Sequence, residues 1–200
     1  MKFSIAMTAF DTYCFLPRAI ACVLQQEHVD WELLLVCDGP TPSDDFDPER
    51  MLARARRRAP GRRMECWRLP RAEGCYGNVA RRFALEQATG DYVCWVNHDN
   101  LIAPRYLAAH AENIRKSPGC VSVVDIAYWR NAVPHGPFPR ALRRSRIDLL
   151  NFAAPTELCR RVDAFGDGMS REYAADWRVF DALRRLAPVE RRAGIVGTHF

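Results

Sequence analysis

Short apolar runs alternate with amphipathic segments along this chain. Six runs have the length and the composition of strands: 3–7, 32–37, 64–69, 92–96, 121–126 and, with a weaker pattern, 195–199. Most of them are separated by segments in which apolar residues recur every three or four positions, as on the buried face of a helix. Strands that alternate with helices usually form a largely parallel sheet covered on both faces, which predicts an α/β fold.

Start and stop signals mark several of the helices. Pro17 stands at a favourable first-turn position before an apolar face that includes Ile20, and Asp47 with Pro48 predicts the cap and first turn of the next helix. Further helices are expected over 78–88, ending before Gly90, and over 104–116. A late helix is marked by the spacing of Tyr173, Trp177, Phe180 and Leu183.

One stretch breaks the alternation. The segment 127–146 contains Pro134, Gly136, Pro137 and Pro139, and these residues punctuate regular structure. We interpret this segment as a long loop that is placed to move over a binding site.

Length and composition fit one soluble globular domain. The chain has 200 residues, of which 48% are hydrophobic and 26% charged, so it buries a sizeable core without disulfide help. Its longest nearly apolar runs, 31–37 and 92–96, fall far short of the roughly 20 residues of a membrane-spanning helix. The apolar start is too short for a signal peptide and soon reaches Asp11, so we interpret it as a first strand and expect a cytoplasmic protein.

Cysteine usage points to the same compartment. No two cysteines form a C-x-x-C pair and no export signal accompanies them, which favours reduced thiols over disulfides. Cys37, Cys66 and Cys94 lie in strand-like runs, where a thiol acts as a small hydrophobic group, and this favours packing over a structural zinc site.

Arginine carries almost all of the positive charge. The net charge is +5, and Lys2 and Lys116 are the only lysines. Arginine clusters at 54–63 and 140–146 are able to contact the phosphates of nucleic acid, lipid or a nucleotide, or to form a solvated helix face. For the first cluster the solvated face is favoured, because Met51, Leu52 and Ala55 give the same segment a buried stripe.

The candidate chemistry lies where the predicted strands end, because parallel sheets bind ligands at the carboxyl ends of their strands. Polar residues follow three strands: 8–11, Asp38 with Gly39, and 97–100. Asp38 is able to accept hydrogen bonds from a ribose or a base, or to sit in a solvated Asp-Gly turn. The sequence Asn-His-Asp-Asn at 97–100 suits a divalent cation shared with a diphosphate, or a polar turn that caps the next helix.

At this point the chain resembles family 2 glycosyltransferases of the GT-A fold. Residues 3–11 are similar to their opening strand, S-V-V-I-P-T-Y-N, and 31–40 to their second strand, E-I-I-V-V-D-D-G-S, with Cys37 and Asp38 at the two aspartates. Residues 77–92 resemble the helix and strand that lead to the family's D-x-D motif, whose place is taken by 97–99. Residues 151–152, 158–166 and 175–177 resemble the acceptor-side segment, which ends in an acidic pair. The order and spacing of these matches cover nearly the whole chain.

The resemblance implies a fold and a reaction. It implies one GT-A domain over 1–200, with a nucleotide-sugar-binding half at 1–103 and an acceptor-side half at 104–200. It implies an inverting transfer of a sugar from a nucleotide donor, UDP- or GDP-linked, to a hydroxyl of a glycan or lipid-linked acceptor. Such a reaction serves the synthesis of glycans, polysaccharides or glycolipids. By charge alone, we expect peripheral contact with anionic lipids at the inner membrane face through Arg140, Arg143, Arg144 and Arg146.

The resemblance also assigns roles to residues at the strand ends. Asp38 would contact the base or ribose, and Thr8 and Phe10 would line the nucleoside pocket. Asp99 would reach a Mg²⁺ or Mn²⁺ ion that bridges the diphosphate. Arg81 would assist the phosphates, or else make a structural ion pair.

Roles follow for the second half as well. Asp176 would be the general base that takes a proton from the acceptor hydroxyl, or else a carboxylate favoured by its helix dipole. His199 would be an additional metal ligand, or else a partly buried neutral histidine. We expect His98 to be structural.

Two departures from the family pattern matter. Asn97 replaces the first aspartate of the motif; its neutral amide oxygen is a weaker metal ligand and leaves less negative charge at the site. Ala175 stands where the family commonly has an acidic residue. These departures keep a catalytically silent nucleotide-sugar binder as an alternative. A sugar nucleotidyltransferase is disfavoured because the chain lacks a glycine-rich loop with a lysine, and a nucleic-acid binder because no such motif is present.

Overall fold

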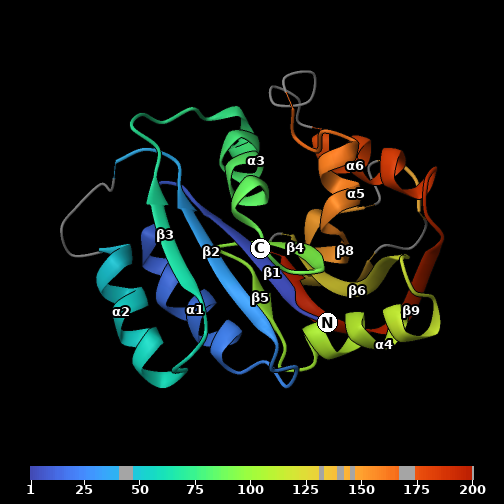
Figure 1. Cartoon of the computed structure of the whole chain (residues 1–200), viewed down its shortest axis with the longest axis horizontal. Coiled ribbons are helices and arrows are strands. Elements are labelled where there is room, and N and C mark those ends of the chain that lie inside the picture. Colours follow the sequence, from blue (N-terminus) through green and yellow to red (C-terminus); the bar gives the residue numbers. More distant parts are fainter. Residues whose placement is uncertain (41–46, 131–132, 139–141, 145–146, 167–173, 200) are drawn as a thin grey trace.

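A single mixed sheet runs through the whole molecule (Figure 1). The computed structural model describes residues 1–40, 47–130, 133–138, 142–144, 147–166 and 174–199. In the sheet the strands follow the order β3-β2-β1-β4-β8-β6-β9-β5, and β7 pairs with β6. The strands are β1 (Phe3–Ala9), β2 (Trp31–Cys37), β3 (Met64–Arg68), β4 (Tyr92–Asn97), β5 (Leu101–Ile102), β6 (Val121–Arg130), β7 (Val133–Phe138), β8 (Phe152–Pro155) and β9 (Val189–His199).

The parallel arrangement expected from the sequence dominates the first half. Strands β3, β2, β1 and β4 are all parallel, and β6 pairs with β9 in parallel too. Antiparallel strands extend this core, because β8 joins β4 to β6 and β5 lies against β9. The α/β prediction is confirmed, with a sheet that is parallel on one side and mixed on the other.

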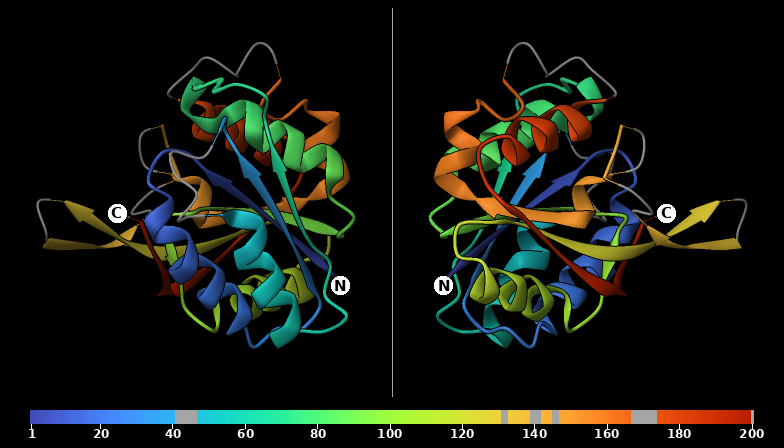
Figure 2. Two further views of the ribbon diagram at one scale, coloured as in Figure 1. Left: turned by 90° about the vertical axis from the view of Figure 1, so that its left-hand side faces the viewer. Right: turned by 90° about the vertical axis from the view of Figure 1, so that its right-hand side faces the viewer.

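Helices cover both faces of the sheet (Figures 1 and 2). The helices are α1 (Leu16–Leu24), α2 (Pro48–Arg58), α3 (Asn78–Gln87), α4 (Tyr106–Lys116), α5 (Thr156–Arg161) and α6 (Ala175–Arg184). Residues of α1, α2 and α4 share one apolar core with alternate residues of β1 and β2, whereas α3, α5 and α6 pack in a second core. Alternation along β2 is plain: Leu33 and Leu35 enter the first core, Leu34 and Val36 the second.

The predicted helix signals agree with the structure. Pro48 begins α2, and the Asp47 carboxylate caps it by accepting a hydrogen bond from the Glu49 amide at 3.0 Å. The buried stripe expected on this helix is present, since Leu52 and Ala55 are buried. The late helix is α6, with Phe180 and Leu183 buried, whereas Tyr173 lies outside the described residues.

The expected loop at 127–146 is wrong for most of the residues that the structure describes there. Strand β6 continues to Arg130, and β7 pairs back against it in a hairpin that projects from the body of the molecule (Figure 2). Proline lacks a backbone N–H and is tolerated in edge strands, and β7 has a ladder only with β6. The prolines of β7 therefore led to the prediction of a loop where the structure has a strand. Residues Arg140 and Arg146 lie outside the described residues.

Three short elements were missed and one strand was underestimated. Strands β5 and β8 have two and four residues, and α5 has six, too few to display a period. Strand β9 begins at Val189, six residues before the predicted start, because its first part is polar. Among the described residues, no helix has the length and apolar character needed to cross a membrane.

Candidate active site

The sheet topology places the predicted strand-end residues together. Strand β1 lies between β2 and β4 and is parallel to both, so the three strands end at one edge. Backbone hydrogen bonds hold the next residues on either side of β1: Asp38 donates to the Ala9 carbonyl at 2.8 Å, and His98 donates to the Thr8 carbonyl at 3.0 Å. The segments that carry Asp38 and Asp99 thus flank the same strand end.

Asp38 is tied to the loop that follows β3. Its Oδ1 accepts a hydrogen bond from the Glu73 amide at 2.8 Å, and the residue is only 3% exposed. Gly39 has φ +94°, and a Cβ there would lie 2.8 Å from the Ala72 nitrogen, so this close approach requires glycine. Phe10, in contrast, is 51% exposed at the end of β1. An exposed ring and a buried carboxylate at the ends of two neighbouring strands are suited to line a nucleoside pocket.

Asn97 links β1 to α3. Its amide Oδ1 accepts one hydrogen bond from the Thr8 hydroxyl and a second from Arg81 Nη2, both at 3.0 Å. Arg81 itself is 7% exposed, and its Nη1 donates to the Asn78 Oδ1 at 2.8 Å and to the Tyr76 carbonyl at 2.6 Å. Among the described residues, the hydrogen-bond acceptors of this guanidinium are all neutral.

Both ring nitrogens of His98 lie within hydrogen-bonding distance of residues that follow or end β1. The residue is buried, its Nδ1 lies 3.2 Å from the Thr8 carbonyl oxygen, and its Nε2 lies 3.0 Å from the Thr12 hydroxyl. The carbonyl can only accept, so Nδ1 carries the proton and Nε2 accepts from the hydroxyl. Burial lowers the pKa of His98, which keeps the ring neutral.

Asp99 and Asn100 each have a side-chain oxygen that accepts no hydrogen bond from the described residues. Asp99 Oδ1 and Asn100 Oδ1 are both buried, and neither has a hydrogen-bond partner in the part of the chain that the structure describes. Strand β9 brings His199 to this turn, because Thr198 is paired with Leu101, the first residue of β5. An orphaned carboxylate oxygen close to an imidazole is a fitting pair of donors for a divalent cation.

Asp148 is a site residue that sequence reasoning missed. Its Oδ2 lies 3.1 Å from His199 Nδ1, and its Oδ1 accepts a hydrogen bond from the Leu150 amide at 2.8 Å. The contact with Asp148, together with the charges of Asp99 and Asp176, raises the pKa of His199 although burial opposes this. The sequence around Asp148 carries only the signal of a capping residue, and the structure has that capping box too.

Asp176 lies in the first turn of α6 and has a carboxyl group with a perturbed pKa. Burial and the nearby charge of Asp148 raise its pKa to about 6, and the charges of Arg81 and His199 only partly offset them. A carboxylate with a pKa near neutrality is suited to accept a proton and release it again. The alternative, a first-turn carboxylate favoured by the helix dipole, would by itself lower this pKa.

Five ionisable groups thus form one electrostatic cluster: Arg81, Asp99, Asp148, Asp176 and His199. The charges of the three aspartates act on Arg81, whose pKa burial lowers. They also act together on His199. Four of these residues were predicted from the sequence, and they come from α3, the turn after β4, α6 and the end of β9.

The cluster does not by itself enclose a cation. Within the ranges that the structure describes, no three His, Cys, Asp or Glu side chains form a metal-binding group. Mg²⁺ is commonly held by one or two carboxylates together with substrate phosphates. Asp99 with its free oxygen, and His199, fit that pattern.

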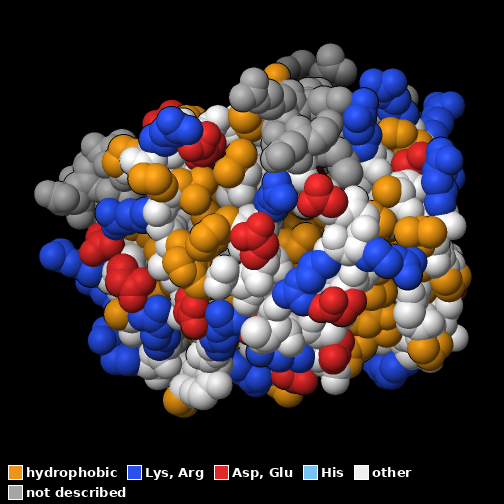
Figure 3. All heavy atoms as spheres, turned by 45° about the horizontal axis from the view of Figure 1, so that its top comes forward, with side chains coloured by type: hydrophobic (Ala, Val, Ile, Leu, Met, Phe, Trp, Pro, Cys, Tyr) orange, Lys and Arg blue, Asp and Glu red, His pale blue; other side chains and the backbone are white. Residues whose placement is uncertain are grey.

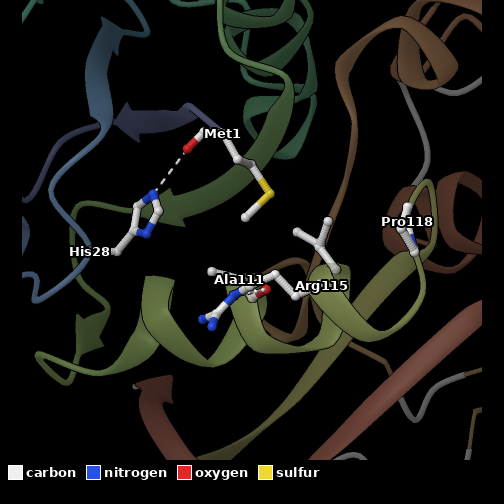
Figure 4. A pocket seen from close by; sticks show the side chains of 6 residues that line it. Met1, His28, Ala111, Arg115 and Pro118 are labelled. Atoms are coloured by element: carbon white, nitrogen blue, oxygen red, sulfur yellow. Dashed lines mark hydrogen bonds between the residues drawn. The ribbon is translucent and has the colours of Figure 1, made fainter.

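One hollow of the surface lies away from this edge. A hollow of about 560 Å³ is lined by Met1, His28, Ala111, Ile114, Arg115 and Pro118 (Figure 4). Met1 and His28 precede β1 and β2, so this hollow is at the opposite edge of the sheet. On the face seen in Figure 3, basic side chains are interspersed with acidic ones. Arg143 and Arg144 are exposed.

Comparison with known proteins agrees with this geometry. A curated relative from Haemophilus influenzae, an uncharacterized glycosyltransferase, is 28% identical over 100 residues, which are 50% of this chain and 37% of that protein. The structure of S. aureus TarS in complex with UDP superimposes with a TM-score of 0.81 and 16% identity, over 100% of this chain and 60% of that one. A mannosyltransferase from Pyrobaculum calidifontis, in complex with GDP-Man and Mn²⁺, superimposes with a TM-score of 0.73 and 16% identity. The match covers 99% of this chain and 56% of that one.

These likenesses show the GT-A fold, and the chain spans little more than a third of the curated relative and about 60% of the solved structures. The family model for glycosyl transferase family 2 matches residues 4–160, from the second residue of β1 to within α5. With more than three quarters of its length matched, the chain belongs to glycosyl transferase family 2.

Proposed function

We propose that this domain is an inverting glycosyltransferase that moves a sugar from a nucleotide sugar to a hydroxyl group of an acceptor. One observation carries the proposal: Asp176, with a pKa raised to about 6, shares one cluster with Arg81 and Asp99 at the carboxyl ends of the parallel strands. A proton acceptor and a place for a diphosphate therefore lie together.

Asp176 supplies the base. It takes the proton from the acceptor hydroxyl while that oxygen attacks the anomeric carbon, and the bond from that carbon to the diphosphate breaks on the opposite face. A pKa near 6 leaves the carboxylate mostly ionised at pH 7 and still basic enough to accept the proton. Attack opposite the leaving group inverts the configuration of the sugar.

The donor lies across the ends of β1, β2 and β4. Asp38 and Phe10 hold the nucleoside, with Thr8 beside them, and Arg81 faces the diphosphate. Asp99 and His199 would hold a Mg²⁺ or Mn²⁺ ion, and such an ion would supply Lewis-acid stabilisation of negative charge on the diphosphate. The similar structures from S. aureus and Pyrobaculum calidifontis, with UDP and GDP-Man respectively, support a UDP- or GDP-linked donor.

The acceptor is proposed as a glycan or a lipid-linked glycan, used in polysaccharide or glycolipid synthesis in the cytoplasm. Exposed Arg143 and Arg144 support peripheral contact with an anionic membrane. Binding to vesicles with and without anionic lipid, measured by co-sedimentation for the protein and an Arg143→Ala, Arg144→Ala variant, tests this part separately.

The test of the reaction is Asp176→Asn. We expect turnover to fall about 100- to 10,000-fold, the range typical for loss of a general base, while donor binding stays within about threefold. The measurements are release of UDP or GDP from a panel of sugar nucleotides, and calorimetric binding of the same donors.

Asp181→Asn is the matched control. Asp181 lies on the same helix, paired with Arg184 and Arg185 at the surface, so its loss removes the same charge without touching the cluster. Unchanged turnover in Asp176→Asn would remove the base assignment. Tight donor binding by the unchanged protein, without product from any acceptor, would instead favour the catalytically silent binder.

A further inference from the structure

The hydrogen-bond partners of Arg81 are all uncharged. Its guanidinium has five N–H groups, of which three are used: one by Asn97 Oδ1, one by Asn78 Oδ1 and one by the Tyr76 carbonyl. Among the described residues, Arg81 has no carboxylate within hydrogen-bonding or ion-pairing distance. Arg81 is only 7% exposed, and within the described ranges its Nε has no hydrogen-bond acceptor.

A buried guanidinium with only neutral hydrogen-bond partners is unusual in a protein interior. A buried charge is normally paired with an opposite charge, because the loss of hydration is otherwise not compensated. Here the three aspartates of the cluster act on Arg81 only at longer range. The ring of Phe165 lies 5.9 Å from its guanidinium carbon and supports one side. The positive charge is held in place but not neutralised by direct contact.

Asn97 contacts Arg81 without neutralising its positive charge. Both lone pairs of its amide oxygen are used, one by the Thr8 hydroxyl and one by Arg81, so this oxygen is not left facing a metal ion. An aspartate at the same position would offer the same geometry and add a negative charge 3.0 Å from the guanidinium. It would turn a neutral contact into an ion pair.

We infer that Asn97 is a positioning residue that aims an unneutralised Arg81 at the donor diphosphate, so that arginine replaces part of the positive charge of a metal ion. This inference rests on the proposed function, because it assigns the charge that receives the donor. It predicts that nucleoside diphosphate binding survives removal of divalent metal in the natural chain. It also predicts that metal dependence increases when Asn97 becomes an acid.

Asn97→Asp is the direct test, with UDP and GDP as probes. Affinity is measured by calorimetry in the presence of Mn²⁺ and in the presence of EDTA. We expect the natural chain to lose less than about threefold in EDTA. The variant should lose about tenfold or more in EDTA, the size expected when a hydrogen bond to a charged group is redirected, and should recover with Mn²⁺.

Two further variants distinguish an ion pair with Arg81 from a mere change in the net charge of the protein. Asn78→Asp places a carboxylate on the same guanidinium from its other contact and should reproduce the effect. Gln25→Glu makes the same amide-to-acid change at an exposed position on the far end of α1 and should bind as the natural chain does. The nucleosides uridine and guanosine should bind all four proteins equally, because they carry no phosphate. Thermal unfolding of each variant shows that it is folded.

The outcomes are distinct. Failure of the natural chain to bind either diphosphate, with or without Mn²⁺, overturns the proposed function and this inference with it. If the natural chain binds the diphosphates, and EDTA weakens binding by the same factor in the natural chain and in Asn97→Asp, this inference alone is overturned. A weakened variant whose loss also extends to the nucleosides overturns it too, because the effect would then not act through the diphosphate.

Discussion

Two carboxylates at opposite edges of the same sheet have opposite environments. Glu32, near the start of β2, accepts five hydrogen bonds, from Lys2 Nζ, Ser4 Oγ, the Thr89 amide and hydroxyl, and Arg63 Nη1. Burial alone would raise its pKa, but these donors outweigh burial and lower it to about 2. Asp176, at the other edge, has its pKa raised to about 6.

The difference separates a structural acid from a reactive one. Glu32 ties together β1, β2, β3 and the turn before β4, and it has no exposed surface through which a ligand could reach it. Asp176 is only partly buried and gets too few donors to offset its desolvation. Donors that satisfy a carboxylate fix it in its charged form, whereas their lack leaves it ready to take a proton.

The largest effect on stability is expected at Glu32. We expect Glu32→Gln to lower the free energy of unfolding by about 3 kcal/mol at pH 7, because that energy is needed to hold the Glu32 pKa at about 2 instead of 4.5. The folded pKa lies below the unfolded one, so this contribution is full above pH 4.5 and disappears as pH falls through 2. Urea unfolding at pH 7 and pH 3 measures it.

The control for this prediction is Glu65→Gln, since Glu65 is a more exposed acid that pairs with the same Arg63. Its loss should cost less than about 1 kcal/mol. Equal losses in the two variants would contradict the account of Glu32.

Asp176→Asn should change stability in the opposite direction. We expect a gain of up to about 2 kcal/mol at pH 8, because the charged form of Asp176 is buried at a cost and the amide removes that cost. The folded pKa lies above the unfolded one, so the natural chain loses this stability as pH rises through 6. Urea unfolding should give equal stabilities near pH 4, and a loss at pH 8 would contradict the raised pKa.

Activity should respond to the same titration. If Asp176 is the base, kcat/KM for transfer should fall as pH drops below about 6, because the protonated carboxyl cannot accept a proton. A pH series in constant ionic strength, with Asp181→Asn as control, measures the midpoint. A midpoint near 4 would mean that the carboxyl group is not perturbed.

The smallest effect is expected at Asp148. Its charge is the second cause of the raised pKa of Asp176, so Asp148→Asn should move the acid limb of the pH profile to lower pH. The variant also removes the partner of His199, whose lost positive charge works the other way but is the weaker of the two influences. If the acid limb moved to higher pH instead, the loss of the His199 charge would outweigh the loss of the Asp148 charge, and the prediction would be wrong.

The sequence allowed the sheet core and most of the site to be predicted, for identifiable reasons. Strands β1, β2 and β4 are fully buried apolar runs, and their parallel order places Asp38 and Asp99 beside the same strand end. The β6–β7 hairpin was hidden by its prolines, and Asp148 was hidden because a capping residue needs no further role. The contact of Asn97 with Arg81 joins residues of different elements, and no periodicity reports such a contact.

The most direct test of the central claim is a carboxyl titration of Glu32 and Asp176 in the same sample, by carbon-13 nuclear magnetic resonance. The account predicts that Asp176 titrates near pH 6 while Glu32 stays charged until about pH 2, and that only the Asp176 signal disappears in Asp176→Asn. Titration of both groups near pH 4 would contradict it, because the two edges of the sheet would then hold equivalent acids.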